Sequence, residues 1–307
     1  AMSLIGDQER TGIGVTDAGS NDIYCGGDLQ QWKRLANTLK LRIGMRALGA
    51  PGENFAMNTI TSALAQPLLD DASGSVLMKK DFVISEWASS AYGDIWHDFG
   101  TESAASFTLG NTLVKYMNDN ADPRLLQYAE PIDGGTFIFR DGGTDANFQD
   151  RIDFLSNTFD NVGATYTVTI VDTTTTFEVP GGQWVGQPER TNGDTKPFMG
   201  YDMFSIPSNK VTQKRGQQVD AYPEIIISSA ESYFLQAEAA VRGISSGDAQ
   251  ALMNSGISEA MKLWGVSGAD IETYTTTAPL ADISAGTMDE KLEKIAIQRW
   301  IASYTDG

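Results

Sequence analysis

The predicted fold follows from one segment, Ser228-Ser-Ala-Glu-Ser-Tyr-Phe-Leu-Gln-Ala-Glu-Ala-Ala-Val-Arg-Gly243. Ser228 and Glu231 are spaced as a helix-capping pair, in which each side chain satisfies a free backbone donor, and Gly243 is a typical helix end. The apolar residues recur at the spacing of one helix face: Phe234, Ala237 and Val241. Small alanines between them suit a close helix crossing, so we predict a helix that packs against a second helix.

Two further capped helices are predicted C-terminal to this one. Asp248 and Gly265 bracket one of them, and Thr287 with Glu290 opens the other. The apolar residues of the first are Met253, Ile257, Met261 and Trp264. Those of the second form a broad apolar surface: Leu292, Ile295, Ile297, Trp300 and Ile301. We therefore predict antiparallel helix pairs and expect Trp300 to lie in the core.

The N-terminal region predicts another amphipathic helix. Asp28 followed by Gln31 is a capping pair, and Gly49 with Pro51 ends the pattern. Its apolar stripe is Trp32, Leu35, Leu39, Ile43 and Ala47. Shorter helices are expected from Asn54 to Ala65 and from Lys79 to about Tyr92. The basic residues share the remaining faces, which we interpret as solvated or ion-paired rather than as a docking surface for a partner: Lys33, Arg34, Lys40, Arg42 and Arg46.

Residues 131–225 are rich in Gly, Thr, Pro and Asp, and the spacing of their apolar residues changes from a helical period to a two-residue period. Tyr166, Val168 and Ile170 alternate with threonines, as in a half-buried strand, and Thr173–Val179 is a plausible partner strand. The sequence thus predicts one mainly α-helical unit over residues 1–307, in which residues 131–225 insert a β-hairpin and long loops. Such loops commonly carry recognition surfaces.

Composition excludes several functions. The 22 Lys and Arg residues against 40 Asp and Glu residues give a formal charge of −18, so nucleic acid is not an expected partner. Cys25 and His97 are the single cysteine and the single histidine, which leaves no internal disulfide and no Cys/His zinc site. No apolar run reaches the length of about 18 residues that a membrane-spanning helix needs. We predict no metal and no cofactor.

Aromatic residues outside the periodic stripes are candidate ligand contacts. Trp184, Tyr201 and Phe204 lie in the Gly-rich middle, where a flat ring can pack against the C–H face of a sugar or can instead pin a loop. Tyr92 and Trp96 lie beside His97, and we include both rings among the candidates.

His97 raises the question of catalysis. Asp94 or Asp98 could orient it as a general base. No candidate nucleophile or glycine elbow accompanies it, so we favour a structural, hydrogen-bonded histidine and predict no catalytic residue.

An acidic segment offers alternating oxygen ligands: Asn118, Asp119, Asn120 and Asp122. Calcium prefers six to eight oxygens, but the central glycine and final glutamate of a calcium-binding EF-hand loop are missing. We favour an acidic turn, in which Asp122 accepts backbone hydrogen bonds and Pro123 fixes the backbone before Arg124.

Four segments, in order along the chain, resemble the SusD/RagB family. They are Asp22-Ile-Tyr-Cys-Gly-Gly-Asp28 with the helix that continues to Arg46, Asn120-Ala-Asp-Pro-Arg-Leu125, Tyr233-Phe-Leu-Gln-Ala-Glu-Ala-Ala-Val-Arg-Gly243, and Glu293-Lys-Ile-Ala-Ile-Gln-Arg-Trp-Ile-Ala302. The resemblance implies tetratricopeptide-like helix pairs packed on a loop-rich ligand-binding part. It also implies a surface-exposed outer-membrane lipoprotein of Bacteroidetes-type bacteria, which captures glycans, or in some members peptides, for a SusC-like TonB-dependent barrel.

The chain departs from the family near its ends. Cys25 follows Asp22-Ile-Tyr and lacks the context of the family's lipid-anchored cysteine. The family's N-terminal helices and the segment after the Trp300 helix also lack counterparts. We therefore expect an internal portion of a longer protein, truncated at both ends, whose lipid anchor lies outside this segment.

These observations predict a non-enzymatic nutrient-binding subunit at the cell surface. A secreted glycan-cleaving enzyme that uses a carboxylate pair is the alternative, since 40 acidic residues always allow such a pair to be imagined. A surface adhesion or structural module is a third possibility.

Overall fold

The structure is a computed structural model of the chain, and it describes residues 19–51, 53–78, 108–188, 203–208, 210–211 and 222–305. The chain divides into two compact units. The first combines Ala1–Lys79 with Pro223–Gly307, and the second is Lys80–Tyr222. Most of the predicted insertion of residues 131–225 therefore belongs to the second unit.

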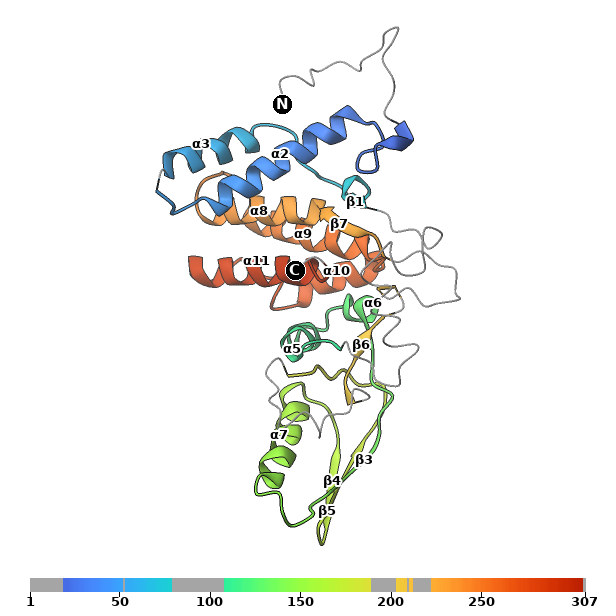
Figure 1. The fold of residues 1–307 in the computed structure, drawn as a ribbon. Coiled ribbons are helices and arrows are strands. Elements are labelled where there is room, and N and C mark those ends of the chain that lie inside the picture. Colours follow the sequence, from blue (N-terminus) through green and yellow to red (C-terminus); the bar gives the residue numbers. More distant parts are fainter. Residues whose placement is uncertain are drawn as a thin grey trace. The chain divides into compact units, whose positions relative to one another are not determined.

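The first unit is a stack of helix pairs (Figure 1). Its helices are α2 (Leu29–Arg46), α3 (Glu53–Leu64), α8 (Ser229–Val241), α9 (Ala249–Leu263), α10 (Gly268–Thr277) and α11 (Met288–Ala302). The pairs α2–α3 and α8–α9 follow one another as layers, with α8 in contact with α2, α9 and α11, and α10 and α11 both pack on α9. A two-stranded antiparallel sheet joins β1 (Val76–Met78) to β7 (Glu224–Ile227), and short 3₁₀ helices lie at Gly19–Asn21 and Ala72–Gly74. The predicted mainly α-helical fold with helix pairs is confirmed, and α10 is an addition to it.

Side-chain caps fix where these helices begin. The Ser228 hydroxyl accepts a hydrogen bond from the Glu231 backbone N–H at 3.1 Å, which is half of the predicted pair, because the Glu231 side chain binds Arg42 and Arg299 instead. Thr287 and Glu290 form a complete capping box, and the backbone and side-chain hydrogen bonds from Thr287 lower the pKa of the Glu290 carboxyl. At α2, Asp28 caps alone, because the Gln31 side chain donates to the Gly74 carbonyl instead of completing the predicted pair.

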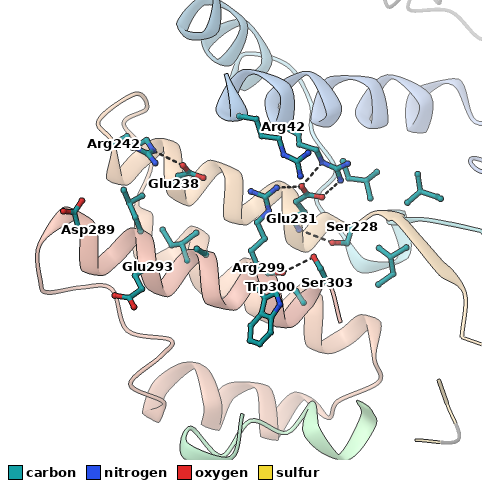
Figure 2. A pocket seen from close by; sticks show the side chains of 18 residues that line it. Arg42, Ser228, Glu231, Glu238, Arg242, Asp289, Glu293, Arg299, Trp300 and Ser303 are labelled. Atoms are coloured by element: carbon teal, nitrogen blue, oxygen red, sulfur yellow. Dashed lines mark hydrogen bonds and ion pairs between the residues drawn. The ribbon is translucent and has the colours of Figure 1, made fainter. Parts of the chain in front are cut away.

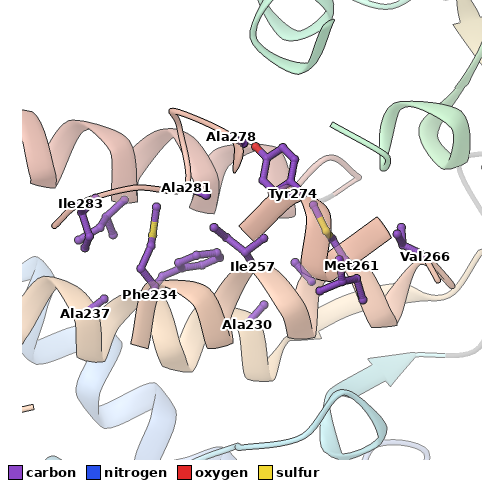
Figure 3. Packing of buried hydrophobic residues seen from close by; sticks show 14 residues of the cluster. Ala230, Phe234, Ala237, Ile257, Met261, Val266, Tyr274, Ala278, Ala281 and Ile283 are labelled. Atoms are coloured by element: carbon purple, nitrogen blue, oxygen red, sulfur yellow. The ribbon is translucent and has the colours of Figure 1, made fainter. Parts of the chain in front are cut away.

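The contact between α8 and α9 forms the main core of this unit (Figure 3). Phe234 of α8 is fully buried and lies over Gly256 of α9. A Cβ atom on Gly256 would come within 2.7 Å of two Phe234 ring carbons, so only glycine allows this close approach. Around it pack further buried residues of α9 and α10 and of the loop before α11: Ile257, Met261, Tyr274, Ala281 and Ile283.

The predicted apolar stripe of α2 is confirmed in its first half, where Leu35 is buried and Trp32 and Leu39 pack against the same cluster. It is wrong toward the end of the helix, where Ile43 is 62% exposed and Leu41 and Met45 are buried instead. Two polar residues turn the helix this way. The Asn37 amide donates to three carbonyls at the end of α3 and just after it, those of Ala63, Gln66 and Pro67, the nearest at 2.8 Å. The Thr38 hydroxyl accepts a hydrogen bond from the Leu69 N–H at 3.0 Å.

The sequence also predicts Trp300 in the core, and that expectation is wrong, because its side chain is 45% exposed. The buried face of α11 is Ile295, Gln298 and Ile301. The fully buried Gln298 amide donates to the Tyr274 hydroxyl of α10 at 2.7 Å. This polar contact rotates α11 so that Trp300 faces away from the α9–α10 core.

The second unit mixes short helices with a sheet (Figure 1). Its elements are α5 (Asn111–Asp119), α6 (Leu125–Tyr128), β2 (Ala129–Glu130), β3 (Gly135–Arg140), α7 (Phe148–Asn161), β4 (Thr167–Val171), β5 (Thr174–Val179) and β6 (Ile206–Pro207). The predicted hairpin is confirmed as β4–β5, and β3 pairs antiparallel with the other side of β5. Helix α7 and strand β3 are additions that the sequence pattern did not predict.

Aromatic rings hold α7 on one face of this sheet. Phe159 of α7 lies 5.2 Å from Tyr166 and 6.2 Å from Phe177 between ring centroids, and Tyr166 stacks on Phe177 at 5.8 Å. Val168 and Ile170, predicted as the buried side of β4, are instead 38% and 61% exposed. The central strand β5, rather than β4, therefore supplies the buried residues.

The acidic segment before α6 forms a turn. Asp122 and Arg124 are both fully buried at the side chain and form an ion pair, while the Arg124 N–H donates to the Asp122 carboxylate at 3.0 Å. The neighbouring oxygen-bearing side chains have other partners: Asp119 pairs with Lys115, and the amides of Asn118 and Asn120 donate to backbone carbonyls. This geometry supports the acidic-turn interpretation.

The close approach of α8 and α9 predicts that Gly256→Ala destabilises the protein by about 1–3 kcal/mol, because the added methyl group collides with a buried ring. Gly268→Ala is the matched control, since Gly268 also lies in a helix but a Cβ atom there meets nothing within 4 Å. Its change should be neutral or slightly stabilising. Chemical denaturation of both variants measures the difference, and equal stabilities would contradict the packing described.

The two tryptophans Trp264 and Trp300 should respond differently to truncation. Trp264 is 2% exposed, so Trp264→Ala should cost about 3–5 kcal/mol of unfolding free energy. Trp300→Ala should cost about 1 kcal/mol or less, because nearly half of the side chain is already in contact with solvent. Thermal and chemical unfolding test this order, and a larger loss at Trp300 would show that α11 packs in another phase.

Candidate functional site

A groove of about 790 Å³ lies in the first unit between α2, α8 and α11. Helix α11 lines it with a stripe at helical spacing: Asp289, Leu292, Glu293, Ala296, Arg299, Trp300 and Ser303. From the first to the last of these residues the stripe extends about 21 Å, at 1.5 Å per residue. Strand β7 adds an apolar wall through Ile225, Ile226 and Ile227. The groove is therefore elongated and lined by both apolar and charged side chains.

A three-residue ion cluster lies within the groove (Figure 2). The Glu231 carboxylate, 14% exposed, accepts from Arg42 Nε at 2.7 Å and from Arg299 Nη2 at 2.8 Å, and Arg42 Nη2 makes a further contact with it. One carboxylate from α8 thus binds one guanidinium from α2 and another from α11. The two guanidinium groups carry two formal positive charges against the single negative charge of the carboxylate.

Further charged residues line the groove farther along α8 and on α11. Arg242 Nε donates to Glu238 at 2.8 Å, and Asp289 and Glu293 lie on α11 (Figure 2). Within the described ranges neither Asp289 nor Glu293 forms an ion pair with a cation. With Arg42, Arg46, Arg242 and Arg299 against Glu231, Glu238, Asp289 and Glu293, the formal charges of the lining balance.

Trp300 also lines the groove, but its indole projects from the other side of α11 than the Arg299 guanidinium (Figure 2). The ring is 45% exposed and therefore offers an accessible apolar surface apart from the ion cluster.

Trp184, predicted as a ligand contact, lies in the second unit and is half-buried. Its backbone segment is held on both sides: the Gln183 carbonyl accepts from the Ile132 N–H at 2.9 Å, and the Val185 N–H donates to the Ser205 hydroxyl at 3.1 Å. The indole is therefore carried by an ordered segment while part of its surface remains accessible.

Phe204 lies near this segment but is only 2% exposed. A ring without an accessible face cannot stack on a sugar, so we assign it a packing role. Tyr201, Tyr92 and Trp96, together with His97, lie outside the described residues.

The sequence did not predict the groove as a site. It marked Arg42 as part of an ion-paired face, which the structure confirms, but it gave no partner for it. Glu231 and Arg299 are far from Arg42 along the chain, so only the stacking of helices brings them together. The available signal was the set of basic residues in an otherwise acidic sequence.

In the described part of the chain, no group of three or more His, Cys, Asp or Glu side chains is placed to hold a metal ion. Among the same residues, none of the helices has both the length and the apolar character required to cross a bilayer.

Solved structures share this fold. A SusD-like protein from Bacteroides thetaiotaomicron is 21% identical, with a TM-score of 0.56 over 93% of this chain and 51% of that chain. A SusD homolog from Bacteroides fragilis is 19% identical, with a TM-score of 0.61 over 92% and 53%. A chitin-binding protein is 22% identical, with a TM-score of 0.60 over 92% and 51%. The chain spans about half the length of these relatives.

No curated protein matches the sequence significantly. A protein family does match, over residues 5–307, and it is described as starch-binding and associating with the outer membrane. The match extends over both units and includes the four segments singled out in the sequence. This chain therefore belongs to the SusD-like family.

Proposed function

We propose that this chain is the binding portion of a non-enzymatic nutrient receptor at the bacterial cell surface. It captures a glycan, or in the alternative a peptide, and delivers it to a SusC-like TonB-dependent transporter in the outer membrane. The observation that carries this proposal is the family match over residues 5–307. The accessible indoles of Trp184 and Trp300 support it, because sugar-binding surfaces need exposed aromatic faces.

The proposed ligand contacts in the second unit start with Trp184. Tyr201, Tyr92 and Trp96 remain proposed contacts from the sequence. A lipid anchor outside this segment would hold the protein on the membrane surface, and the formal charge of −18 suits a well-solvated position there.

A glycan-cleaving enzyme is the competing function, and its products distinguish it. Incubating the chain with a panel of polysaccharides should produce no new reducing ends while binding is retained. Reducing ends that appear in proportion to protein concentration would instead establish hydrolysis.

Truncation of Trp184 should separate binding from folding. Stacking of an aromatic ring on a flat ligand face is worth about 1–3 kcal/mol, by analogy with bases, so Trp184→Ala should weaken binding of the cognate oligosaccharide about ten- to a hundred-fold. The unfolding midpoint should change little. Isothermal titration beside a thermal melt measures both effects.

Phe204→Ala is the matched control from the same unit. Because that ring is buried, its loss should destabilise the protein by about 3–5 kcal/mol. Unchanged affinity in Trp184→Ala would remove Trp184 from the site, and a collapsed melt would show that it is a structural pin.

If the chain binds a transporter barrel, we expect the complex to persist when the basic residues Lys33 and Arg34 of α2 are neutralised. A lid on a barrel should bury more than about 1,000 Å² in total. Arg34 also has partners inside the chain, since it donates to the Leu68 carbonyl at 2.8 Å and pairs with Asp70 at 2.6 Å. Lys33→Gln combined with Arg34→Gln should therefore leave co-purification with the barrel nearly intact. Loss of the complex with folding unchanged would identify that face as the docking surface.

A further inference from the structure

One edge of the three-stranded sheet in the second unit is open. Strand β4 stands at the end of the order β3–β5–β4 and pairs with β5 on one side. The Asp141 N–H donates to the Thr173 carbonyl at 2.7 Å, and this bond sets the alternation along β5, whose odd-numbered residues face β3. The even-numbered residues of β5 therefore face alternate residues of β4: Thr167, Thr169 and Val171. It follows that the backbone N–H and C=O groups of Val168 and Ile170 point away from the sheet.

The outward backbone groups of β4 are available to another strand. Within the described ranges, neither Val168 nor Ile170 makes a backbone hydrogen bond outside the β4–β5 ladder. The strand also lacks the features that commonly block an edge, since it has no charged residue, no proline and no irregularity in its register with β5. The opposite edge strand, β3, ends in the charged residue Arg140. Strand β4 is therefore the better template for a fourth strand.

A hollow of about 420 Å³ adjoins the start of β4. Among the described residues that line it, Glu178 alone is charged. The Thr167 hydroxyl donates to the Glu178 carboxylate at 3.3 Å, which holds the carboxylate on the β4 side of β5. Cations elsewhere in this unit pair with aspartates instead: Lys115, Arg124 and Arg151. The hollow thus offers a carboxylate to a basic side chain from another molecule.

Two further exposed carboxylates flank the strand. Asp160 accepts a hydrogen bond from the Tyr166 hydroxyl at 3.0 Å near the start of β4, and Asp172 follows Val171 in the turn at its end. Neither forms an ion pair with a cation of the described residues. A second copy of the chain would bring its own formal charge of −18 to this edge and would be repelled. Charge complementarity therefore favours a basic segment of a different molecule as the occupant.

We propose that β4 binds an extended peptide as a fourth strand of the sheet, with a lysine or arginine of the peptide paired to Glu178. Paired residues share a sheet face, so a peptide residue opposite Thr167 projects on the face that carries Glu178. Two strand spacings, about 10 Å between backbones, separate it from Glu178, and a long basic side chain spans this distance. Peptide residues opposite Val168 and Ile170 are apolar, because those side chains are 38% and 61% exposed on the other face. This site does not depend on the glycan contacts proposed above.

Synthetic peptides test both parts of the proposal. The full 307-residue chain is titrated calorimetrically with the acetylated and amidated peptide Thr-Ile-Thr-Val-Lys-Thr, which fits β4 in antiparallel orientation with its lysine opposite Thr167. Replacing the lysine with glutamate should weaken binding about ten-fold or more. N-methylation of the valine amide should have a similar effect, because that N–H donates to β4. N-methylation of the third residue is the matched control and should change the affinity little, since its N–H faces away from β4.

Variants of the protein assign the binding to β4. Glu178→Gln should remove most of the preference for the lysine peptide over the glutamate peptide. Asp153→Asn is the matched control, because it removes one negative charge from α7, which packs through Phe159 on the Phe177 face of the sheet, opposite to Glu178. It should leave the preference unchanged. Val168→Pro removes an outward N–H without interrupting the β4–β5 ladder, so it should weaken binding about ten-fold or more.

Several results would overturn the proposal: no binding of the lysine peptide, equal affinity for the lysine and glutamate peptides, or equal effects of the two N-methylations. Dimerisation of the chain that Val168→Pro abolishes would assign the edge to a second copy instead. The peptide site and the proposed function fail separately. Trp184→Ala should keep the peptide affinity, and Val168→Pro should keep the affinity for the cognate oligosaccharide, whereas a peptide affinity that depends on Trp184 would refute the β4 site.

Discussion

The carboxylate of Glu231 is the constraint on which the arrangement of the helical unit depends. It lies in the first turn of α8, where the helix dipole favours negative charge, and it is largely buried. Removing a carboxylate from water costs several kcal/mol, so the position is tolerable only if both Arg42 and Arg299 reach it. Those two guanidinium groups come from different helix layers. The cluster therefore fixes how far α2 and α11 can slide along α8, even if it adds little net stability.

The groove results from the same constraint. Because Arg299 must point from α11 toward Glu231, the residue after it in the helix cannot also point into the α9–α10 core. The core side of α11 is already committed to Ile295, Gln298 and Ile301, and the amide of Gln298 needs the Tyr274 hydroxyl. Trp300 is left facing solvent. The accessible indole is thus a consequence of satisfying two buried polar groups.

Local signals made much of the fold predictable. The caps at Ser228 and Thr287 are set by residues three positions apart; the reciprocal pair is predicted correctly at Thr287, and at Ser228 the serine half of it forms. Which face of α2 is buried was less predictable. Apolar spacing cannot reveal that the buried Asn37 donates hydrogen bonds to carbonyls at and after the end of α3, 26 to 30 residues away. Helix α7 lies in a Gly- and Thr-rich region whose composition hides it, although Phe148, Ile152, Leu155 and Phe159 have helical spacing. The groove could not be predicted at all, since its charges meet only through tertiary packing.

Trp184 and Trp300 show two routes by which a sequence can indicate a ligand surface. Trp184 fits no helical or strand period, which predicts an accessible ring, and the structure leaves it half-buried on an ordered segment. Trp300 fits a helical period, which predicts a core residue, yet the polar partners of its neighbours expose it. Exposing a large ring sacrifices roughly 1.5–3 kcal/mol of potential burial free energy per side chain. A single exposed ring is common and needs no function. Trp300 is such a ring, because the polar partners of Gln298 and Arg299 already account for its exposure, whereas Trp184 is the ring whose accessibility the sequence pattern itself predicts.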